Sequence, residues 1–399
     1  MRILAVDRRL TSRALVVDTD GLVAAAGRLA RESLAPRAAR YDAEATHPVE
    51  NWRDVWRHGL LAMGIPRRFG GLELDMLTYI KIVERLAAGC TNTGMTVHMH
   101  STVTRFIDAL AKEDQKAFYF REVVADGKLF GSWGSEPETR GGTAMRLTTV
   151  VPQNGGYVIN GVKHFCTMSG GAHRYMIHCS SGADDPLESQ WLALLPHDSP
   201  GIEQIGDWDT LGMRATVSPA MKLNNCFVGP DSLLGQPGEA PRSGVPQGFG
   251  LGFAAVYIGA AKAAFDFTRE FAKTQTFAPD PAPIAESLPV QRTVAEMSMA
   301  LECARQVLHA SASEWPGANP AQRAVMAARA KYLATVSALD VTSKAIQIAG
   351  GRSAHKQMPL ERLYRDVRTS TLMPPNLERC LELVGRSELG LDTPLYRDA

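Results

Sequence analysis

The strongest constraint on the fold of this chain is a change in the character of its sequence that occurs twice. From about residue 20 to residue 130, glycine and proline are sparse and apolar residues recur at helical spacing, as they do within 52–63. Between about 131 and 240, glycine and proline become frequent, and apolar and polar residues alternate as in a half-buried strand, for example over 221–227. After Pro246 the helical spacing returns. The chain is therefore expected to fold as a helical region, a β region and a second helical region.

This order excludes a nucleotide-binding doubly wound sheet, in which strands and helices alternate along the chain. In agreement, no Gly-x-Gly-x-x-Gly motif follows a predicted strand. The fold class expected from the sequence is α+β. Its expected parts are an N-terminal tail at 1–18, an N-terminal helical domain at 19–130, a central antiparallel β domain at 131–240 and a C-terminal helical domain at 241–399.

Two short segments predict where the chain turns. The sequence Gln153-Asn154-Gly155-Gly156 is typical of a hairpin turn that leads into a strand. The proline-rich stretch 277–283 cannot continue a helix, because each proline lacks a backbone donor and fixes its own φ. We therefore expect it to connect two long helices.

The charge of the chain is balanced, with 43 Lys and Arg against 42 Asp and Glu. Such a chain offers no broad field to attract nucleic acid or an anionic membrane, so neither is expected as a partner. Apolar runs fall short of a membrane helix, and charges interrupt the first residues too early for a secretory signal. We expect a cytoplasmic protein. The six cysteines are scattered without metal-binding spacing, so no metal is expected.

Seven short motifs follow one another along the chain. They are Gly64-Ile65-Pro66 with Phe69-Gly70-Gly71, Ser135-Glu136-Pro137, the stretch 156–163, Leu211-Gly212-Met213-Arg214, Leu234-Gly235, the stretch 347–351, and Leu363-Tyr364-Arg365-Asp366. Their order and spacing resemble the acyl-CoA dehydrogenase superfamily of flavoproteins from about residue 20 to residue 390. The resemblance implies a C-terminal four-helix bundle after the β domain, a homodimer or homotetramer, and FAD as cofactor, with FMN as the alternative.

The resemblance also indicates which residues surround the flavin. A flavin ring that accepts a hydride needs hydrogen-bond donors along its N1, O2, N5 and O4 edge. By position, Trp133 and Ser135 belong to one flavin loop, Phe165 packs on the ring, and Thr167 places a hydroxyl near N5. These four residues are the expected contacts of the ring.

A second set of cofactor contacts is expected far along the chain. The resemblance implies that Gln347, Gly350 and Gly351 approach the phosphates or ribose of the cofactor, since glycine lets backbone come close to a ligand. The same glycines would also serve as an ordinary helix stop. An arginine that the family often places near this site, to reach the FAD pyrophosphate in the neighbouring subunit, is replaced by Thr274.

The catalytic base of the family is missing from both of its usual places. Dehydrogenation of an acyl thioester needs a carboxylate that removes the α-proton. The two positions hold Pro374 and Phe249, and neither residue can accept a proton. One explanation is that Glu378, one helical turn beyond Pro374, acts as the base. The other is a resemblance to the flavin monooxygenases of the same fold, which use reduced flavin and O2 and need no such base.

His98 and His100 lie on a predicted helix that lines the acyl pocket in the family. Residues two apart on a helix point about 200° away from each other, so both cannot face one site. We favour His100 as the catalytic residue, because Met-His before a Ser-Thr pair resembles a bacterial branch of the family.

The function expected from the sequence is a flavin-dependent oxidoreductase of the acyl-CoA dehydrogenase type, acting on an acyl thioester or a related small molecule. The alternative is a two-component flavin monooxygenase. The two differ in the partner protein: the first needs an electron acceptor, and the second needs a flavin reductase.

Overall fold

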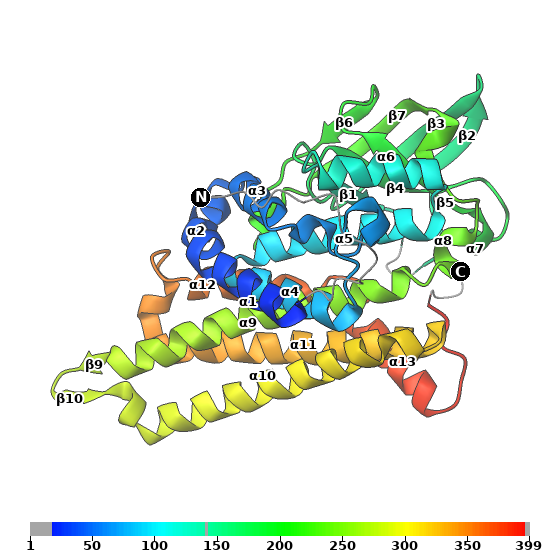
Figure 1. Cartoon of the computed structure of the whole chain (residues 1–399). Helices are drawn as coiled ribbons and strands as arrows, with labels where there is room; N and C mark the ends of the chain where they lie inside the picture. Colours follow the sequence, from blue (N-terminus) through cyan, green and yellow to red (C-terminus); the bar gives the residue numbers. More distant parts are fainter. Residues whose placement is uncertain (1–17, 140–142, 396–399) are drawn as a thin grey trace.

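The computed structural model describes residues 18–139 and 143–395, so nearly all of the predicted tail at 1–18 lies outside the described residues. The N-terminal part is helical, as predicted. Its helices are α1 (Thr19–Leu29), α2 (Ala35–Glu44), α3 (Val49–Arg57), α4 (Met76–Gly89), α5 (Thr91–Leu110) and α6 (Glu113–Val124). Helix α5 is buried along most of its length, polar residues included, because it lies between strand β1 and helix α9 (Figure 1).

The middle part is a twisted sheet. Its strands are β1 (Phe130–Trp133), β2 (Thr149–Gln153), β3 (Gly156–Lys163), β4 (Arg174–Ser180), β5 (Gln190–Pro196), β6 (Ile202–Ile205), β7 (Ala220–Val228) and β8 (Leu233–Leu234), with the short helices α7 (Pro186–Ser189) and α8 (Glu239–Arg242) beside them. The strand order is β6-β7-β3-β2-β4-β5-β8, and β1 pairs with β4. Most pairs are antiparallel, as predicted, but β4 pairs in parallel with β1 and, at one position, with β2.

The hairpin between β2 and β3 turns at Asn154 and Gly155, where the sequence predicts it. Both residues have positive φ, 50° and 78°. Two positive φ angles give the turn the twist that antiparallel strands require, and Asn and Gly tolerate them best.

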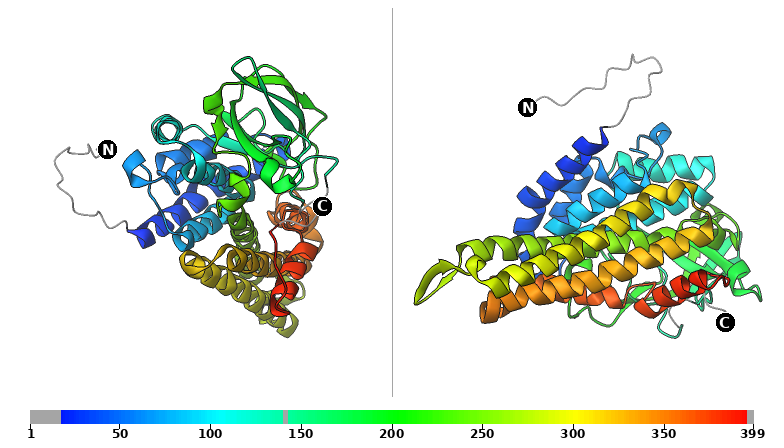
Figure 2. Two further views of the ribbon diagram at one scale, coloured as in Figure 1. Left: turned by 90° about the vertical axis from the view of Figure 1, so that its right-hand side faces the viewer. Right: turned by 90° about the horizontal axis from the view of Figure 1, so that it is seen from below.

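The C-terminal part is a bundle of long helices. Its helices are α9 (Phe249–Thr274), α10 (Leu288–Glu314), α11 (Pro320–Ala349), α12 (Leu360–Arg368) and α13 (Leu377–Glu388). By length and composition the segment Pro246–Thr274 could cross a membrane, but 72% of its most apolar window is buried. That burial has a direct cause, because α9 packs against α4, α5, α10 and α11 (Figure 2). The predicted α+β fold class is confirmed.

The proline-rich segment forms an arm between α9 and α10. Its two strands, β9 (Thr276–Phe277) and β10 (Asp280–Pro283), pair with each other and project beyond the bundle (Figures 1 and 2). The predicted connector between two long helices is confirmed.

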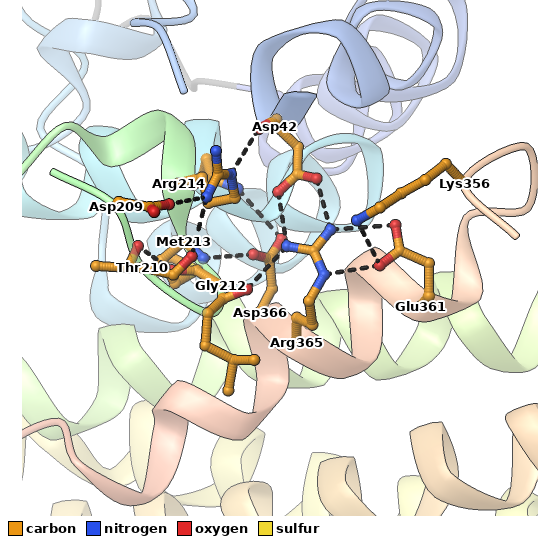
Figure 3. Close-up of polar contacts among 12 residues, drawn as sticks. Asp42, Asp209, Thr210, Gly212, Met213, Arg214, Lys356, Glu361, Arg365 and Asp366 are labelled. Atoms are coloured by element: carbon orange, nitrogen blue, oxygen red, sulfur yellow. Dashed lines mark hydrogen bonds and ion pairs between the residues drawn. The ribbon is translucent and has the colours of Figure 1, made fainter. Parts of the chain in front are cut away.

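Two of the sequence motifs meet where the three parts of the chain join (Figure 3). Both oxygens of Asp42 on α2 accept from Arg365 on α12, at 3.1 and 2.6 Å. Arg365 also pairs with Glu361 and donates to the backbone oxygen of Leu211 at 2.9 Å. We call Asp42, Leu211, Met213, Arg365 and Asp366 the interdomain clasp.

The second half of the clasp is made by Asp366. One of its oxygens accepts from the Met213 N–H at 2.5 Å, and the other accepts from the Asn92 amide at 3.2 Å. Burial raises the pKa of Asp366 to about 6. A Cβ on Gly212 would lie 2.2 Å from the Arg365 carbonyl oxygen, so only glycine fits between Leu211 and Met213.

We predict that Arg365→Gln lowers the free energy of unfolding by about 3 kcal/mol, because it leaves the buried Asp42 carboxylate without its partner. Arg368→Gln is the matched control, since Arg368 is an exposed arginine of the same helix whose one side-chain bond within the described residues is to Thr371. Urea unfolding at neutral pH measures both variants. Equal effects of the two substitutions would show that the clasp does not hold the domains together.

Candidate functional site

Two loops of the β domain meet to form one surface. The loop after β1 carries Ser135, whose backbone oxygen accepts from the His164 N–H at 2.9 Å. The loop after β3 carries Thr167, whose backbone oxygen accepts from the Trp133 indole at 3.3 Å. Because these contacts join the loops at both ends, we treat residues 134–137 and 164–168 as one unit, the platform.

A buried ion pair connects the two loops of the platform. The Lys163 ammonium lies 2.6 Å from one oxygen of Glu136, and neither side chain is more than 1% exposed. The ammonium also donates to the His178 carbonyl oxygen at 2.5 Å. The Glu136 carboxylate further accepts from the backbone N–H groups of Leu147 and Thr148, at 2.7 and 2.9 Å. A buried pair is stable only when such additional bonds satisfy it, and this condition is met here.

The ion pair also sets the charge of both groups. Burial alone would raise the pKa of Glu136, but the Lys163 charge and the two backbone donors bring it below its ordinary value. Burial lowers the pKa of Lys163, against the attraction of Glu136. Glu136 is therefore held as an anion that serves the loop and is not free to accept a substrate proton.

Phe165 is the most conspicuous side chain of the platform. Its φ is 54°, in the left-handed region that bulky residues rarely adopt, and the residue is 60% exposed. The loop is fixed in this conformation because Cys166 and Met168 donate to the backbone oxygens of Pro219 and Thr216, at 3.1 and 3.0 Å. A strained backbone that presents an apolar ring to solvent is typical of a binding site.

The platform also carries two hydroxyls, those of Ser135 and Thr167. Ser135 is exposed, and its hydroxyl makes no hydrogen bond with the described residues. The Thr167 hydroxyl oxygen accepts from Ser218 at 3.2 Å, so its own proton is free to point outward. One flat apolar face beside two donors is the chemistry that binds a planar heteroaromatic ring with acceptors along its edge. The platform therefore fits a flavin.

The Trp133 side chain is buried and does not form part of the exposed surface of the platform. Its ring is fully buried and stacks on Tyr175, with centroids 3.9 Å apart and an angle of 20° between the planes. The indole N–H donates to the Thr167 carbonyl. The side chain predicted as a cofactor contact thus supports the loop, and Ser135, Phe165 and Thr167 form the surface itself.

His100 stands in a different environment from the one that a catalytic residue needs. Its Nδ1 accepts from the Phe130 N–H at 3.0 Å, and its Nε2 donates to the Leu61 carbonyl oxygen at 3.1 Å. Both nitrogens of this fully buried ring are therefore committed to backbone groups. Burial lowers the pKa of His100 to about 4, so the ring is neutral. In this structure the ring joins α5 to β1 and to Leu61, and neither nitrogen is free to contact a ligand.

The structure also shows the surroundings of Phe249 and of Glu378, the alternative base. Phe249 packs among aromatic rings, 6.1 Å from His98 and 6.5 Å from Phe106 between centroids. Glu378 is exposed in the first turn of α13, a helix that Asn376 caps through the Arg379 N–H. Among the described residues, Glu378 makes no contact that would aim it at the platform.

Gln347, Gly350 and Gly351 lie at the exposed C-terminal end of α11. Figures 1 and 2 show this end of the bundle beside the projecting arm, on the opposite side of the molecule from the β domain. One chain therefore does not bring these residues to the platform.

The sequence did not lead us to the buried pairing of Lys163 with Glu136, or to Ser218. A signal for Lys163 was present, because it stands at the end of the 156–163 motif, in a predicted strand, and the structure buries it there. A lysine at an inward position needs a buried partner, and Glu136 of the neighbouring motif was available. Ser218 belongs to no motif, and it meets Thr167 only through the folding of two distant loops.

We predict that Lys163→Met lowers the free energy of unfolding by about 3 kcal/mol, because it leaves a buried carboxylate unpaired. The double variant Glu136→Gln with Lys163→Met should lose less free energy of unfolding than Lys163→Met alone, since it removes both charges together. A double-mutant cycle in urea measures this coupling. Additive losses would show that the two charges do not stabilise each other.

The neutral state of His100 predicts a pH dependence. Its pKa is about 4 in the folded protein against an ordinary value of 6.5. Between these two values the unfolded chain binds a proton at this residue and the folded chain does not. This contribution to stability is full above the ordinary value and is lost as the pH falls toward 4. From about pH 7 to about pH 5 it amounts to roughly 2 kcal/mol, so His100→Gln should lose that much less stability on acidification than the wild type. The free energy of unfolding of both proteins is measured by urea unfolding at each pH. The same dependence on pH in wild type and His100→Gln would contradict the neutral state of His100.

Comparison with known proteins agrees with this geometry. The descriptions of the acyl-CoA dehydrogenase N-terminal, middle and C-terminal domains match residues 18–127, 131–226 and 251–372. The dibenzothiophene monooxygenase of Rhodococcus qingshengii is 28% identical over 380 residues, which cover 90% of each chain. The putative acyl-CoA dehydrogenase YdbM of Bacillus subtilis is 30% identical over 357 residues, covering 88% of this chain and 91% of the relative.

Solved structures show the same fold. The butyryl-CoA dehydrogenase of Megasphaera elsdenii superimposes with a TM-score of 0.87 at 23% identity, over 95% of this chain and 100% of that chain. FMN-bound TdsC from Paenibacillus sp. A11-2 gives 0.84 at 26% identity, over 94% and 99%. On the strength of its motifs, its three domains and these relatives, the chain belongs to the acyl-CoA dehydrogenase family of flavin-dependent oxidoreductases.

Proposed function

We propose that this protein is a flavin-dependent monooxygenase, which receives reduced flavin from a separate reductase in the cytoplasm and inserts one oxygen atom of O2 into a small organic substrate. The observation that carries the proposal is the loss of the family's base: Phe249 and Pro374 occupy both of its positions. Oxygen insertion by a reduced flavin needs no protein carboxylate to remove an α-proton, whereas dehydrogenation of a thioester does.

Three carboxylates that the sequence motifs and the structure single out are not placed to act as that base. Glu136 is fixed by Lys163 and two backbone donors. Asp366 is buried in the interdomain clasp, where it accepts from Met213 and Asn92. Glu378 is exposed on α13. Each of these groups is either committed to another contact or directed to solvent.

The platform residues have separate tasks in this proposal. Phe165 offers an apolar face for the ring, and the Ser135 and Thr167 hydroxyls donate to its polar edge. The flavin, when bound, supplies the redox chemistry. We propose FAD as the flavin. FMN is the alternative, because TdsC, which has the same fold, is an FMN-bound protein. The relatives named as dibenzothiophene monooxygenases, which match nearly the whole chain, support the reaction class.

A second candidate is dehydrogenation of an acyl thioester, with electrons passed to an external acceptor. The relative YdbM, named a putative acyl-CoA dehydrogenase, favours it. In that case Glu378 is the candidate base, because α13 starts directly after the Pro374-Pro375 turn. A shift of this turn would have to bring the exposed carboxylate to the substrate.

An anaerobic experiment separates the two candidates. The flavin-loaded protein is mixed with acyl-CoA compounds of several chain lengths, and the visible absorbance of the oxidised flavin is followed. We predict no bleaching, in wild type or in Glu378→Gln. With chemically reduced flavin and isotopically labelled O2, dibenzothiophene and indole serve as probes, and we expect labelled oxygen in a product. Bleaching by an acyl-CoA that Glu378→Gln abolishes would overturn the monooxygenase proposal in favour of the dehydrogenase.

A further inference from the structure

A cavity of about 860 Å³ lies beside the interdomain clasp, where the three parts of the chain meet. One wall is α2, a second is the loop that carries Leu211 and Arg214, and the third is formed by residues 356–359 and α12. Figure 3 shows Arg214, Lys356 and Arg365 on these walls. The platform residues do not line this cavity. Its size is within the range of small-molecule binding sites, about 300–1,000 Å³.

The walls of this cavity carry more positive than negative charge. Two carboxylates line it, those of Asp42 and Glu361. Five cations line it, and two of them, Arg40 and Arg214, are paired with carboxylates outside the cavity. The five are Arg40, Arg214, Lys356, Arg362 and Arg365. Three cations therefore remain for two carboxylates.

Arg365 engages both of these carboxylates. It donates to the two oxygens of Asp42 at 3.1 and 2.6 Å, and to the two oxygens of Glu361 at 3.1 and 2.7 Å. Lys356 reaches only Glu361, at 3.2 Å, and its side chain is 76% exposed. Neither carboxylate is thus left for Arg362.

Arg362 is the cation of the cavity that has no ion-pair partner within the described part of the chain. Its Nη1 is enclosed there and has no hydrogen-bond acceptor. Asp366, one turn further along α12, accepts from Met213 and Asn92 instead. An enclosed guanidinium nitrogen without an acceptor costs free energy, which an anionic ligand in the cavity would offset. The planar donors of a guanidinium match the oxygens of a phosphate.

A different part of the lining is apolar. Ala35, Ala39 and Ala43 lie at every fourth position of α2, so they share one face of the helix, and each is exposed. We call these three residues the alanine face. Leu211, which is 58% exposed, and Met358 line the cavity as well. A ligand that matches both parts of the lining has a phosphate and an apolar organic group.

We propose that this cavity binds an organic phosphate, a phosphate monoester whose apolar group lies on the alanine face. Arg362 binds the phosphate through its guanidinium, and Lys356 supplies a second cation on a flexible side chain. The ligand contacts all three parts of the chain, so its binding also stabilises the folded protein. The inference does not depend on the flavin, because the platform residues lie outside the cavity.

Calorimetric titration of the whole chain with phenyl phosphate at neutral pH tests this site. Inorganic phosphate, benzoate and phenol are the comparison ligands. We expect phenyl phosphate to bind about tenfold or more tightly than each of them, because only this ligand meets both the cations and the alanine face. Equal binding of inorganic phosphate would show that no apolar group is recognised, and equal binding of benzoate that phosphate is not selected. Either result, or no binding of phenyl phosphate, would overturn the inference.

Substitutions locate the bound ligand. Arg362→Gln should weaken binding of phenyl phosphate about 10- to 100-fold, which corresponds to the loss of one charge-assisted hydrogen bond. Lys356→Gln should weaken it only about threefold, because this lysine is exposed to solvent. Arg368→Gln is the matched control and should bind like wild type, since Arg368 is an exposed arginine of α12 that does not line the cavity.

Ala39→Trp separates lost binding from lost folding. Ala39 is exposed, so a larger side chain should leave the urea midpoint unchanged, while the indole fills the space of the apolar group. We expect this variant to bind phenyl phosphate about tenfold more weakly. Phenyl phosphate should raise the urea midpoint of wild type but not that of Ala39→Trp. Wild-type affinity in both Arg362→Gln and Ala39→Trp would place the ligand elsewhere and overturn the inference.

Discussion

The buried ion pair between Glu136 and Lys163 is the interaction on which the functional part of this structure depends. It joins the loop after β1 to the end of β3, and each charge is fully enclosed and supported by backbone groups. It acts together with the hydrogen bonds of His164 to Ser135 and of Trp133 to Thr167, which join the same two loops. Burying these two charges costs free energy of desolvation. The ion pair fixes the orientation of the two loops, which an apolar contact of equal strength would not do.

The interdomain clasp joins the three domains of the chain, as the ion pair joins the two loops of the platform. Arg365 and Asp366 are neighbours on α12, yet one reaches Asp42 of the N-terminal domain and the other reaches Met213 of the β domain. The two motifs that carry these residues are therefore structural, and their likeness to the family reflects the joining of three domains. Chemistry is left to the loops, which explains how the family's base can be absent while the fold persists.

Sequence reasoning reached the fold because the signals for it are local. The Asn154-Gly155 turn and the helix-breaking prolines of 277–283 are read within a few residues, and both predictions are confirmed. Side-chain partners were harder to predict, because they come from distant segments. His100 illustrates this: its partners Leu61 and Phe130 lie 39 and 30 residues away, and only the folded chain shows that both ring nitrogens are taken. For the same reason the pairing of Lys163 with Glu136, 27 residues away, was not predicted.

The central claim is that a flavin ring lies on the platform against Phe165, and a titration of oxidised flavin into the protein, followed by flavin fluorescence, tests it most directly. The comparison is between wild type, Phe165→Ala and Phe227→Ala, since Phe227 is a similarly exposed phenylalanine of the same domain, at 54% against 60%. We expect wild type and Phe227→Ala to bind alike, and Phe165→Ala to bind about tenfold more weakly through loss of ring stacking. Equal binding by all three proteins would contradict the account.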